Sequence, residues 1–195
     1  MASTRRMGPP GSATWNLILD GAEAILRDEG YAELTSRRIA ERIGIQQRLV
    51  YYYFLTMDDI MVEAFRRLAR RELERLQTAL KSDRPLHEVW EICIHTSDAR
   101  LISEFMALAN RSDGVRKEVI DYIERTRTLQ ADALTRAAQR GGGPLASLPP
   151  VAVTFMATSF ALALNREAQL GIEMGHREIE ELIAGGLAAL EPLGG

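Results

Sequence analysis

One stretch, Ser36 to Met57, constrains the fold more than any other part of the chain. Its sequence, SRRIAERIGIQQRLVYYYFLTM, contains two short helical patterns on either side of Gly44. The first runs from Ser36 to Ile43, and the second from Gln46 to Phe54. Gly44 suits the left-handed backbone conformation that ends a helix. A helix, a tight glycine turn and a second helix predict a helix-turn-helix, whose second helix enters the major groove of DNA.

The second helix of this pattern has an inner and an outer face. We expect Leu49 or Val50, together with Tyr53, to point toward the core. The outward side chains are Gln46, Gln47, Arg48 and Tyr52. Gln forms paired hydrogen bonds with adenine, and Arg forms them with guanine. The outer face therefore has the side chains of a base-reading surface.

Residues 30–60 resemble the DNA-binding domain of the tetracycline-repressor (TetR) family. The residues that carry the resemblance are, in order, Gly30-Tyr31, Thr35, Arg37-Arg38-Ile39-Ala40, Gly44 and Tyr51-Tyr52-Tyr53-Phe54. Their order and spacing match along about thirty residues, and the resemblance covers only the N-terminal third of the chain. It implies a homodimeric transcription factor, most simply a repressor, that binds a double-stranded DNA operator with an inverted repeat and is released by a small-molecule inducer.

This resemblance divides the expected DNA contacts into two groups. The base readers are Arg37, Gln47, Arg48 and Tyr52, with Gln46 as a further candidate. The residues expected to hold phosphates and set the docking angle are Thr35, Ser36, Tyr51 and Tyr53. Phosphate contacts of this kind position a protein on DNA without reading its sequence.

The remaining chain reads as helical, so the predicted fold class is all-α with about nine helices. Residues 1–12 predict a disordered tail, in which Arg5 and Arg6 either touch DNA or belong to a solvated leader. Residues 13–57 are expected to form the DNA-binding head, and residues 58–195 are expected to form a ligand-binding and dimerisation body. Outside the helix-turn-helix, the helices are expected at about Ala13–Glu29, Thr56–Leu80, Pro85–Asn110, Val115–Arg140, Val151–Leu170 and His176–Leu190.

The charge distribution and the cysteine content indicate how the chain binds DNA and in which compartment it works. Residues 1–57 carry seven Arg and six acidic residues, whereas residues 58–195 carry 17 basic and 21 acidic residues. An acidic body discourages unspecific binding along DNA. The single cysteine, Cys93, excludes an intramolecular disulfide and fits a reducing, cytoplasmic compartment. The N-terminus lacks a secretory signal pattern, and the apolar run Val151–Leu164 is shorter than the ~20 residues that span a bilayer.

The last two helices are rich in small residues, which indicates close helix contacts. These residues are Ala157, Ala161, Ala163, Ala184, Gly185, Gly186, Ala188 and Ala189. Each glycine inside a helix costs about 1 kcal/mol relative to Ala, so a tight contact must offset that loss. The resemblance implies a four-helix bundle with the same two helices of a second subunit. Packing within one subunit is the alternative.

The body helices are expected to enclose a pocket for a small, largely apolar molecule. The candidate lining residues are Trp90, Cys93, His95, Phe105, Met106, Asn110, Tyr122, Met156, Phe160 and Asn165. Aromatic residues and methionine suit an apolar ligand, although each of them is also an ordinary core residue. Asn165 is the most unusual, because a buried amide needs a hydrogen-bond partner.

Two other classes of protein compete with a DNA-binding regulator. An enzyme is disfavoured, because Cys93 and His95 point to different sides of one helix and the three histidines lack metal-ligand spacing. No cofactor or metal is therefore expected. A helical small-molecule-binding protein or scaffold, whose helix-turn-helix does not regulate transcription, is the alternative. The polar outer face of the second short helix favours DNA binding over that alternative.

Overall fold

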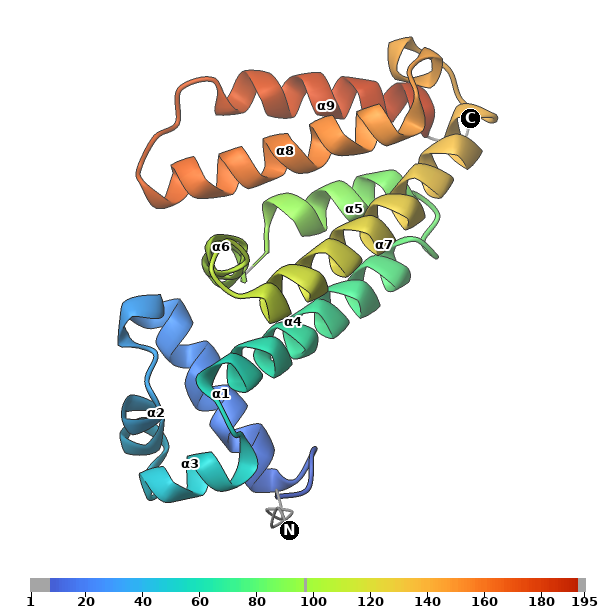
Figure 1. Ribbon diagram of the computed structural model, residues 1–195. Coiled ribbons are helices and arrows are strands. Elements are labelled where there is room, and N and C mark those ends of the chain that lie inside the picture. The colour runs from blue at the N-terminus through green and yellow to red at the C-terminus, as the bar shows by residue number, and fades with distance from the viewer. Residues whose placement is uncertain (1–7, 97, 193–195) are drawn as a thin grey trace. The chain divides into compact units, whose positions relative to one another are not determined.

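The computed structural model describes residues 8–96 and 98–192 of the chain. Those residues form nine α-helices and two short 3-10 helices, and they contain no strand. The predicted all-α fold is confirmed (Figure 1). The helices are α1 (Ala13–Asp28), η1 (Tyr31–Glu33), α2 (Ser36–Ile43), α3 (Gln47–Tyr53), α4 (Met57–Ala79), α5 (Pro85–Ile94), α6 (Ala99–Leu108), α7 (Asp113–Ala138), η2 (Pro144–Ser147), α8 (Pro150–Gln169) and α9 (His176–Leu190). None of the described helices is both long and apolar enough to cross a membrane.

The chain divides into two compact units. The head unit consists of Met1–Ala69 and Arg100–Ile120, and the body unit consists of Arg70–Ala99 and Asp121–Gly195. Helices α4 and α7 each begin in the head unit and end in the body unit. The domain boundary proposed after residue 57 stays a prediction, because this division follows contacts and places α6 and the start of α7 with the head.

Helix α1 supplies the centre of the head core. Ser12 caps its start, since the Ser12 hydroxyl accepts a hydrogen bond from the Trp15 amide at 3.3 Å. Its apolar stripe is fully buried and consists of Ile18, Leu19, Ala22, Ile25 and Leu26. Gly21 lets α2 approach closely, because a Cβ there would lie only 2.7 Å from the Cγ2 of Ile43. Helix α2 therefore packs directly on α1.

The start of α4 is fixed by reciprocal side-chain capping. The Thr56 hydroxyl accepts a hydrogen bond from the Asp59 amide at 3.1 Å, and the Asp59 carboxylate accepts one from the Thr56 amide at 2.9 Å. This reciprocal arrangement is a capping box. Further along α4, the ring of Phe65 packs edge-on against Phe105 of α6, with centroids 5.2 Å apart. These contacts join α6 to the head unit.

The predicted single helix over Pro85–Asn110 is wrong, because two helices occupy this region. Helix α5 ends at Ile94, and α6 begins at Ala99. The His95 backbone has already left helical geometry at φ −112° and ψ 27°, and the Thr96 hydroxyl accepts a hydrogen bond from the Asp98 amide. Thr and Asp side chains compete with the helix for backbone hydrogen bonds in this way. Ser97 lies outside the described residues.

The body core lies between α5, α7, α8 and α9. It consists of Leu86, Trp90, Ala133, Leu134, Ala137, Val153, Ala161, Leu187 and Leu190. The buried Glu191 carboxylate connects the end of α9 to the start of α5, where it accepts hydrogen bonds from the amides of Leu86 at 2.9 Å and His87 at 3.2 Å. Residues 141–143 contact α9, where the Gly142 amide donates to the Ala189 carbonyl at 3.0 Å.

Candidate nucleic-acid interface and ligand cleft

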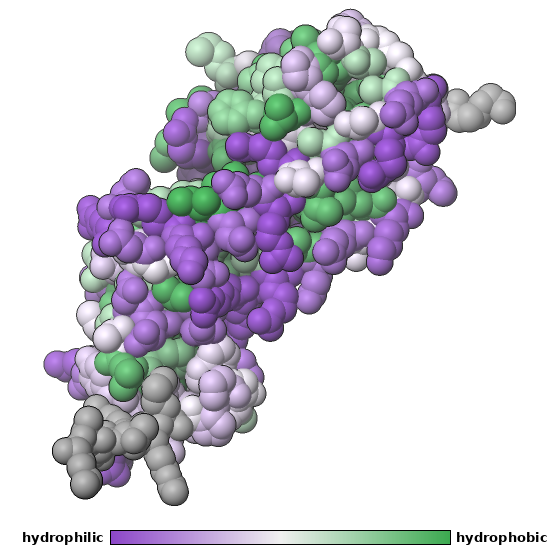
Figure 2. Space-filling view, turned by 45° about the vertical axis from the view of Figure 1, so that its right-hand side comes forward, coloured by the Kyte–Doolittle hydropathy of each residue, from purple (hydrophilic) through white to green (hydrophobic). Residues whose placement is uncertain are grey.

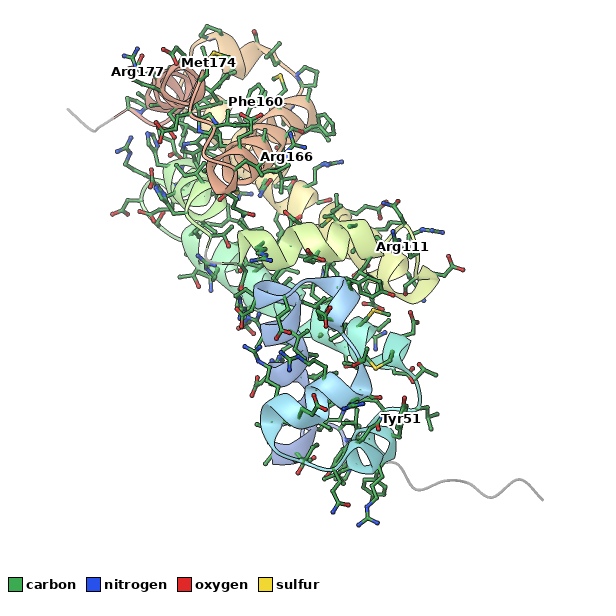
Figure 3. All side chains as sticks on the ribbon, turned by 90° about the vertical axis from the view of Figure 1, so that its left-hand side faces the viewer. Tyr51, Arg111, Phe160, Arg166, Met174 and Arg177 are labelled. Carbon is green, nitrogen blue, oxygen red and sulfur yellow. The ribbon has the colours of Figure 1, made fainter. Side chains whose placement is uncertain are left out.

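Helix α3 has one buried side and one exposed side. Val50 is fully buried and Phe54, which follows the helix, is 2% exposed, whereas Leu49 is only half-buried. Of the two expected inner residues, Val50 is therefore the anchor. The outer side carries Gln46, Gln47, Arg48, Tyr51 and Tyr52, all of which are exposed. Figure 3 shows Tyr51 on α3, which is the second helix of the helix-turn-helix and is called the recognition helix below.

The turn before α3 sets its direction. Gly44 has φ +71° and ψ 34°, the left-handed conformation expected at a helix C-terminus. The Ile45 amide then donates to the Ala40 carbonyl at 3.0 Å, which closes the turn. At the other end of α3, the Phe54 ring stacks on Trp15 of α1 with centroids 5.5 Å apart. Both ends of the recognition helix are thus fixed to the head core.

The basic residues of α2 divide between an anchoring role and an exposed one. Arg38 and Arg42 form ion pairs with Glu29 at the end of α1, at 2.8 and 2.7 Å. Arg37 is highly exposed and pairs with Glu41 on its own helix at 2.8 Å. The hydrogen bond and charge of Glu41 raise the pKa of Arg37 above its ordinary value. Arg37 thus remains exposed, and its assigned role as a base reader stays a prediction.

Three of the predicted phosphate-holding residues, Thr35, Ser36 and Tyr51, already have partners within the head. Thr35 caps α2, because its hydroxyl accepts a hydrogen bond from the Arg38 amide at 3.1 Å. Ser36 is only 5% exposed, and its hydroxyl lies 2.9 Å from both the Tyr51 hydroxyl and the Gln47 amide nitrogen. Their assigned DNA contacts stay predictions.

The residues just before α1 also contact the recognition helix. The Gly8 amide donates to the Tyr52 carbonyl at 3.0 Å. A Cβ on Gly8 would lie 2.3 Å from the Tyr53 ring, so only glycine fits this position. Residues 8–12, predicted to belong to a disordered tail, are thus packed at their start against α3. Arg5 and Arg6 of that tail lie outside the described residues.

The body unit contains a cleft of about 540 Å³, which lies within the size range of small-molecule sites. It is bordered by α5, α7, η2, α8 and α9. Four of the predicted lining residues border it, namely Trp90, Cys93, Met156 and Phe160. The sequence missed Leu86, Val89, Gln130, Leu134, Thr154, Ala157, Thr158 and Ile183, which also border it. Thr154 and Thr158 interrupt the apolar run of α8 one turn apart, and that spacing was the available signal.

The other predicted pocket residues, including Tyr122, are not among the residues that border this cleft. Phe105, Met106 and Asn110 belong to the head unit, where Phe105 is fully buried. His95 is largely exposed and contacts Glu91 at 3.1 Å. The Asn165 amide donates to the carbonyls of Cys93 and Ala161, both at 2.8 Å, so its hydrogen-bond requirement is met by the protein.

Burial perturbs two titratable groups of the body. It raises the pKa of the Cys93 thiol to about 11, and the charge of Glu72 adds to the effect. Burial likewise raises the pKa of Tyr122 above its ordinary value. Cys93 is consequently a neutral thiol at the cleft wall near pH 7 rather than a nucleophilic thiolate. Within residues 8–96 and 98–192, no group of three or more His, Cys, Asp or Glu side chains could hold a metal ion.

The family model of bacterial regulatory proteins, tetR family, matches residues 18–64, which span most of α1, the helix-turn-helix and the start of α4. The head unit of the chain therefore carries a helix-turn-helix DNA-binding domain of the tetR family, as predicted. The match to a family of regulatory proteins also supports the expectation that the chain is not an enzyme.

Known proteins resemble this chain over different parts of its length. A fatty acid metabolism regulator of Bacillus subtilis (strain 168) is 27% identical over 64 residues, which are 33% of each chain. The match therefore spans about a third of the length of that relative. Among solved structures, a TetR transcription regulator from Haloarcula marismortui has a TM-score of 0.73 at 18% identity, over 89% of this chain and 95% of that one.

A transcriptional regulator from Saccharomonospora viridis, solved in complex with choline, has the same TM-score of 0.73 at 18% identity. That likeness covers 80% of this chain and 85% of the other. At such identities the solved structures establish a similarity of fold alone, and this similarity extends beyond the head over 80% and 89% of this chain.

Proposed function

We propose that the protein is a cytoplasmic, homodimeric transcriptional repressor that binds an inverted-repeat operator. The observation that carries this proposal is the exposed outer side of α3, where amide, guanidinium and phenol groups stand on a helix fixed at both ends. Such side chains match the hydrogen-bonding edges of bases in the major groove. A rigid mounting lowers the entropic cost of forming those contacts.

Dimerisation through α8 and α9 would place two heads on two half-sites. Val151, Phe155 and Leu162 of α8 are 54%, 55% and 52% exposed, and Leu182 of α9 is 65% exposed. Side chains at positions 151, 155 and 162 lie on one side of a helix. On the face shown in Figure 2, apolar residues gather over the part of the body formed by α8 and α9. An exposed apolar stripe of this kind is typical of an interface.

The cleft of the body unit is the proposed site for an inducer. Its walls are mostly apolar, with Gln130, Thr154 and Thr158 among the few polar groups, so it suits a small, largely apolar molecule. The choline in the complex of the Saccharomonospora viridis regulator belongs to that protein. A ligand in the cleft would act on α7, which continues into the head unit, and would displace α4 and change the separation of the heads. The shift is limited by the difference in ligand affinity between the two states.

In the head unit, the first turn of α7 is coupled to the start of α4. The Ser112 hydroxyl hydrogen-bonds to the Asp58 carboxylate and also accepts from the Val115 amide at 3.0 Å. Arg66 of α4 pairs with Glu118 of α7 at 2.7 Å. A movement of α7 would therefore reach α4 through these contacts. This coupling supports a route by which a ligand in the cleft changes DNA binding.

The test is fluorescence anisotropy with purified protein and labelled duplexes from the flanks of its own gene, at near-physiological salt. A specific site should be preferred over scrambled DNA by about 10³ or more. Replacing Arg48 and Tyr52 together with Ala should abolish this preference. Arg125→Ala, which removes one exposed arginine from the part of α7 in the body unit, is the control and should retain it. Equal binding to all duplexes, with ligands still bound by the body, would favour the small-molecule-binding scaffold instead.

A further inference from the structure

Ser36 occupies a position that differs from that of an ordinary phosphate contact. It is the first residue of α2 and only 5% exposed, while its neighbour Tyr51 on α3 is 37% exposed. The Ser36 hydroxyl donates to the Tyr51 hydroxyl oxygen at 2.9 Å and accepts from the Gln47 side-chain nitrogen at 2.9 Å. The buried Ser36 hydroxyl of α2 thus connects two exposed side chains of α3.

The direction of these two hydrogen bonds decides what remains available to DNA. Gln47 uses one N–H on Ser36, which leaves its second N–H and its carbonyl oxygen. That donor and acceptor pair is the one that binds N7 and N6 of adenine. Tyr51 accepts from Ser36, so its own O–H stays available as a donor to a phosphate oxygen. Hydrogen bonds in such a chain polarise and strengthen one another.

The Ser36 hydroxyl is not required to build the helix on which it lies. Thr35 is the N-cap of α2, and its hydroxyl accepts the hydrogen bond from the Arg38 amide at 3.1 Å. The contact of α2 with the core is made by Ile39 and Ala40, which are 0% and 3% exposed. The hydroxyl therefore serves the side chains of α3 rather than the fold of α2.

We propose that Ser36 is a positioning residue for base recognition, which fixes the Gln47 amide toward an adenine and the Tyr51 hydroxyl toward a phosphate. This inference rests on the proposed DNA-binding function. A free glutamine side chain samples many rotamers and loses that freedom on binding. The bond to Ser36 selects one arrangement before DNA arrives. Discrimination at one base pair should then depend on a residue that does not touch the DNA.

The experiment begins with an operator selected from a random duplex pool by the full-length wild-type protein. Anisotropy titrations with all single-base variants then identify the position whose preference is lost in Gln47→Ala. Ser36→Ala should reduce discrimination at that position by roughly tenfold, about 1.4 kcal/mol. Ser36→Thr, which keeps the hydroxyl, should restore it. The double variant Ser36→Ala with Gln47→Ala should discriminate no worse there than Gln47→Ala alone.

Two further readouts separate positioning from a phosphate contact. Under the proposal, the salt dependence of nonspecific binding by Ser36→Ala equals that of the wild type. A uniform loss of affinity for all sequences with a smaller salt slope would show that Ser36 holds a phosphate, and it would overturn the proposal. Unchanged discrimination at the Gln47 position would also overturn it. If the alanine variant unfolds, Ser36→Cys retains the volume with a weak hydrogen-bonding group.

Failure of the proposed function has a different signature. In that case the wild-type protein selects no operator, and the inference about Ser36 falls with it. If the wild-type protein selects an operator and only the Ser36 variants behave otherwise than expected, the regulatory function stands and the positioning role alone is refuted.

Discussion

The adjacent glycines of α9, Gly185 and Gly186, offer a direct test of the proposed dimer interface. A Cβ on Gly186 would lie 2.4 Å from the Cδ1 of Leu145 in η2, so this glycine is explained by packing within one subunit. A Cβ on Gly185 meets no atom within 4 Å. Nothing in the described subunit requires a glycine there. Close approach of a second subunit would supply the missing reason.

The two positions therefore predict opposite effects of substitution on the single subunit. Gly185→Ala should stabilise the isolated subunit by about 1 kcal/mol, the difference in helix propensity. For a chain of this size, that gain corresponds to a rise of roughly 2–4 °C in melting temperature. Gly186→Ala gains the same propensity but must displace Leu145, and overpacking of this kind costs about 1–3 kcal/mol. Its melting temperature should stay level or fall.

The dimer is tested by a larger side chain at the same position. Gly185→Leu has open space in one subunit but would clash where two helices cross closely. We expect its dimer dissociation constant to rise about tenfold or more, corresponding to at least about 1.4 kcal/mol. Sedimentation equilibrium measures this dissociation constant directly. The measurement is made without ligand, because Gly185 also borders the cleft and its substitution could change ligand binding. A Gly185→Leu protein that dimerises like the wild type would refute the assignment of α9 to the interface.

Further predictions concern Arg48, Thr35 and Cys93. Arg48→Ala should cost about 1–3 kcal/mol at one base pair and relax specificity there, measured by titration of operator variants. Thr35→Ala should lower the free energy of unfolding by about 1 kcal/mol through loss of the α2 cap. Thr35→Asp should keep that cap and stability yet weaken binding to every DNA sequence, since it adds a negative charge; equal DNA affinity would contradict the proximity of Thr35 to phosphate. Cys93, with its pKa raised to about 11, should react with iodoacetamide about 100-fold more slowly at pH 8 than an ordinary thiol. Because the folded state holds this proton more firmly than the unfolded state, stability should fall as pH rises from about 9 to about 11, and Cys93→Ala should lack that component.

The local elements of the head were predictable because their signals lie within a few residues of one another. Gly44 ends α2 in the left-handed conformation, and Thr56 with Asp59 caps the start of α4, as their spacing indicated. The break between α5 and α6 was missed, although Thr96 and Asp98 are helix-capping residue types. The apolar spacing continues across this break and concealed it.

The ligand cleft was predictable only in part. The cleft is bordered by four of the predicted residues, namely Trp90, Cys93, Met156 and Phe160. Phe105 instead lies in the head unit, and the Asn165 amide already donates hydrogen bonds to backbone carbonyls. Aromatic and methionine residues on an apolar stripe mark burial, and they do not tell a packed core from a cleft wall. That distinction depends on which helices lie opposite each other.

The sequence by itself determined that this chain is all-α, where most helices begin and end, and which side of α3 faces outward. Each of these follows from hydrogen bonds and side-chain spacing within one or two helical turns. Only the tertiary structure decided that Ser36 meets Gln47 and Tyr51, and that Gly185 faces open space while Gly186 meets Leu145. Such contacts join residues of different helices, and they depend on how those helices pack, which the periodicity of a single helix does not specify.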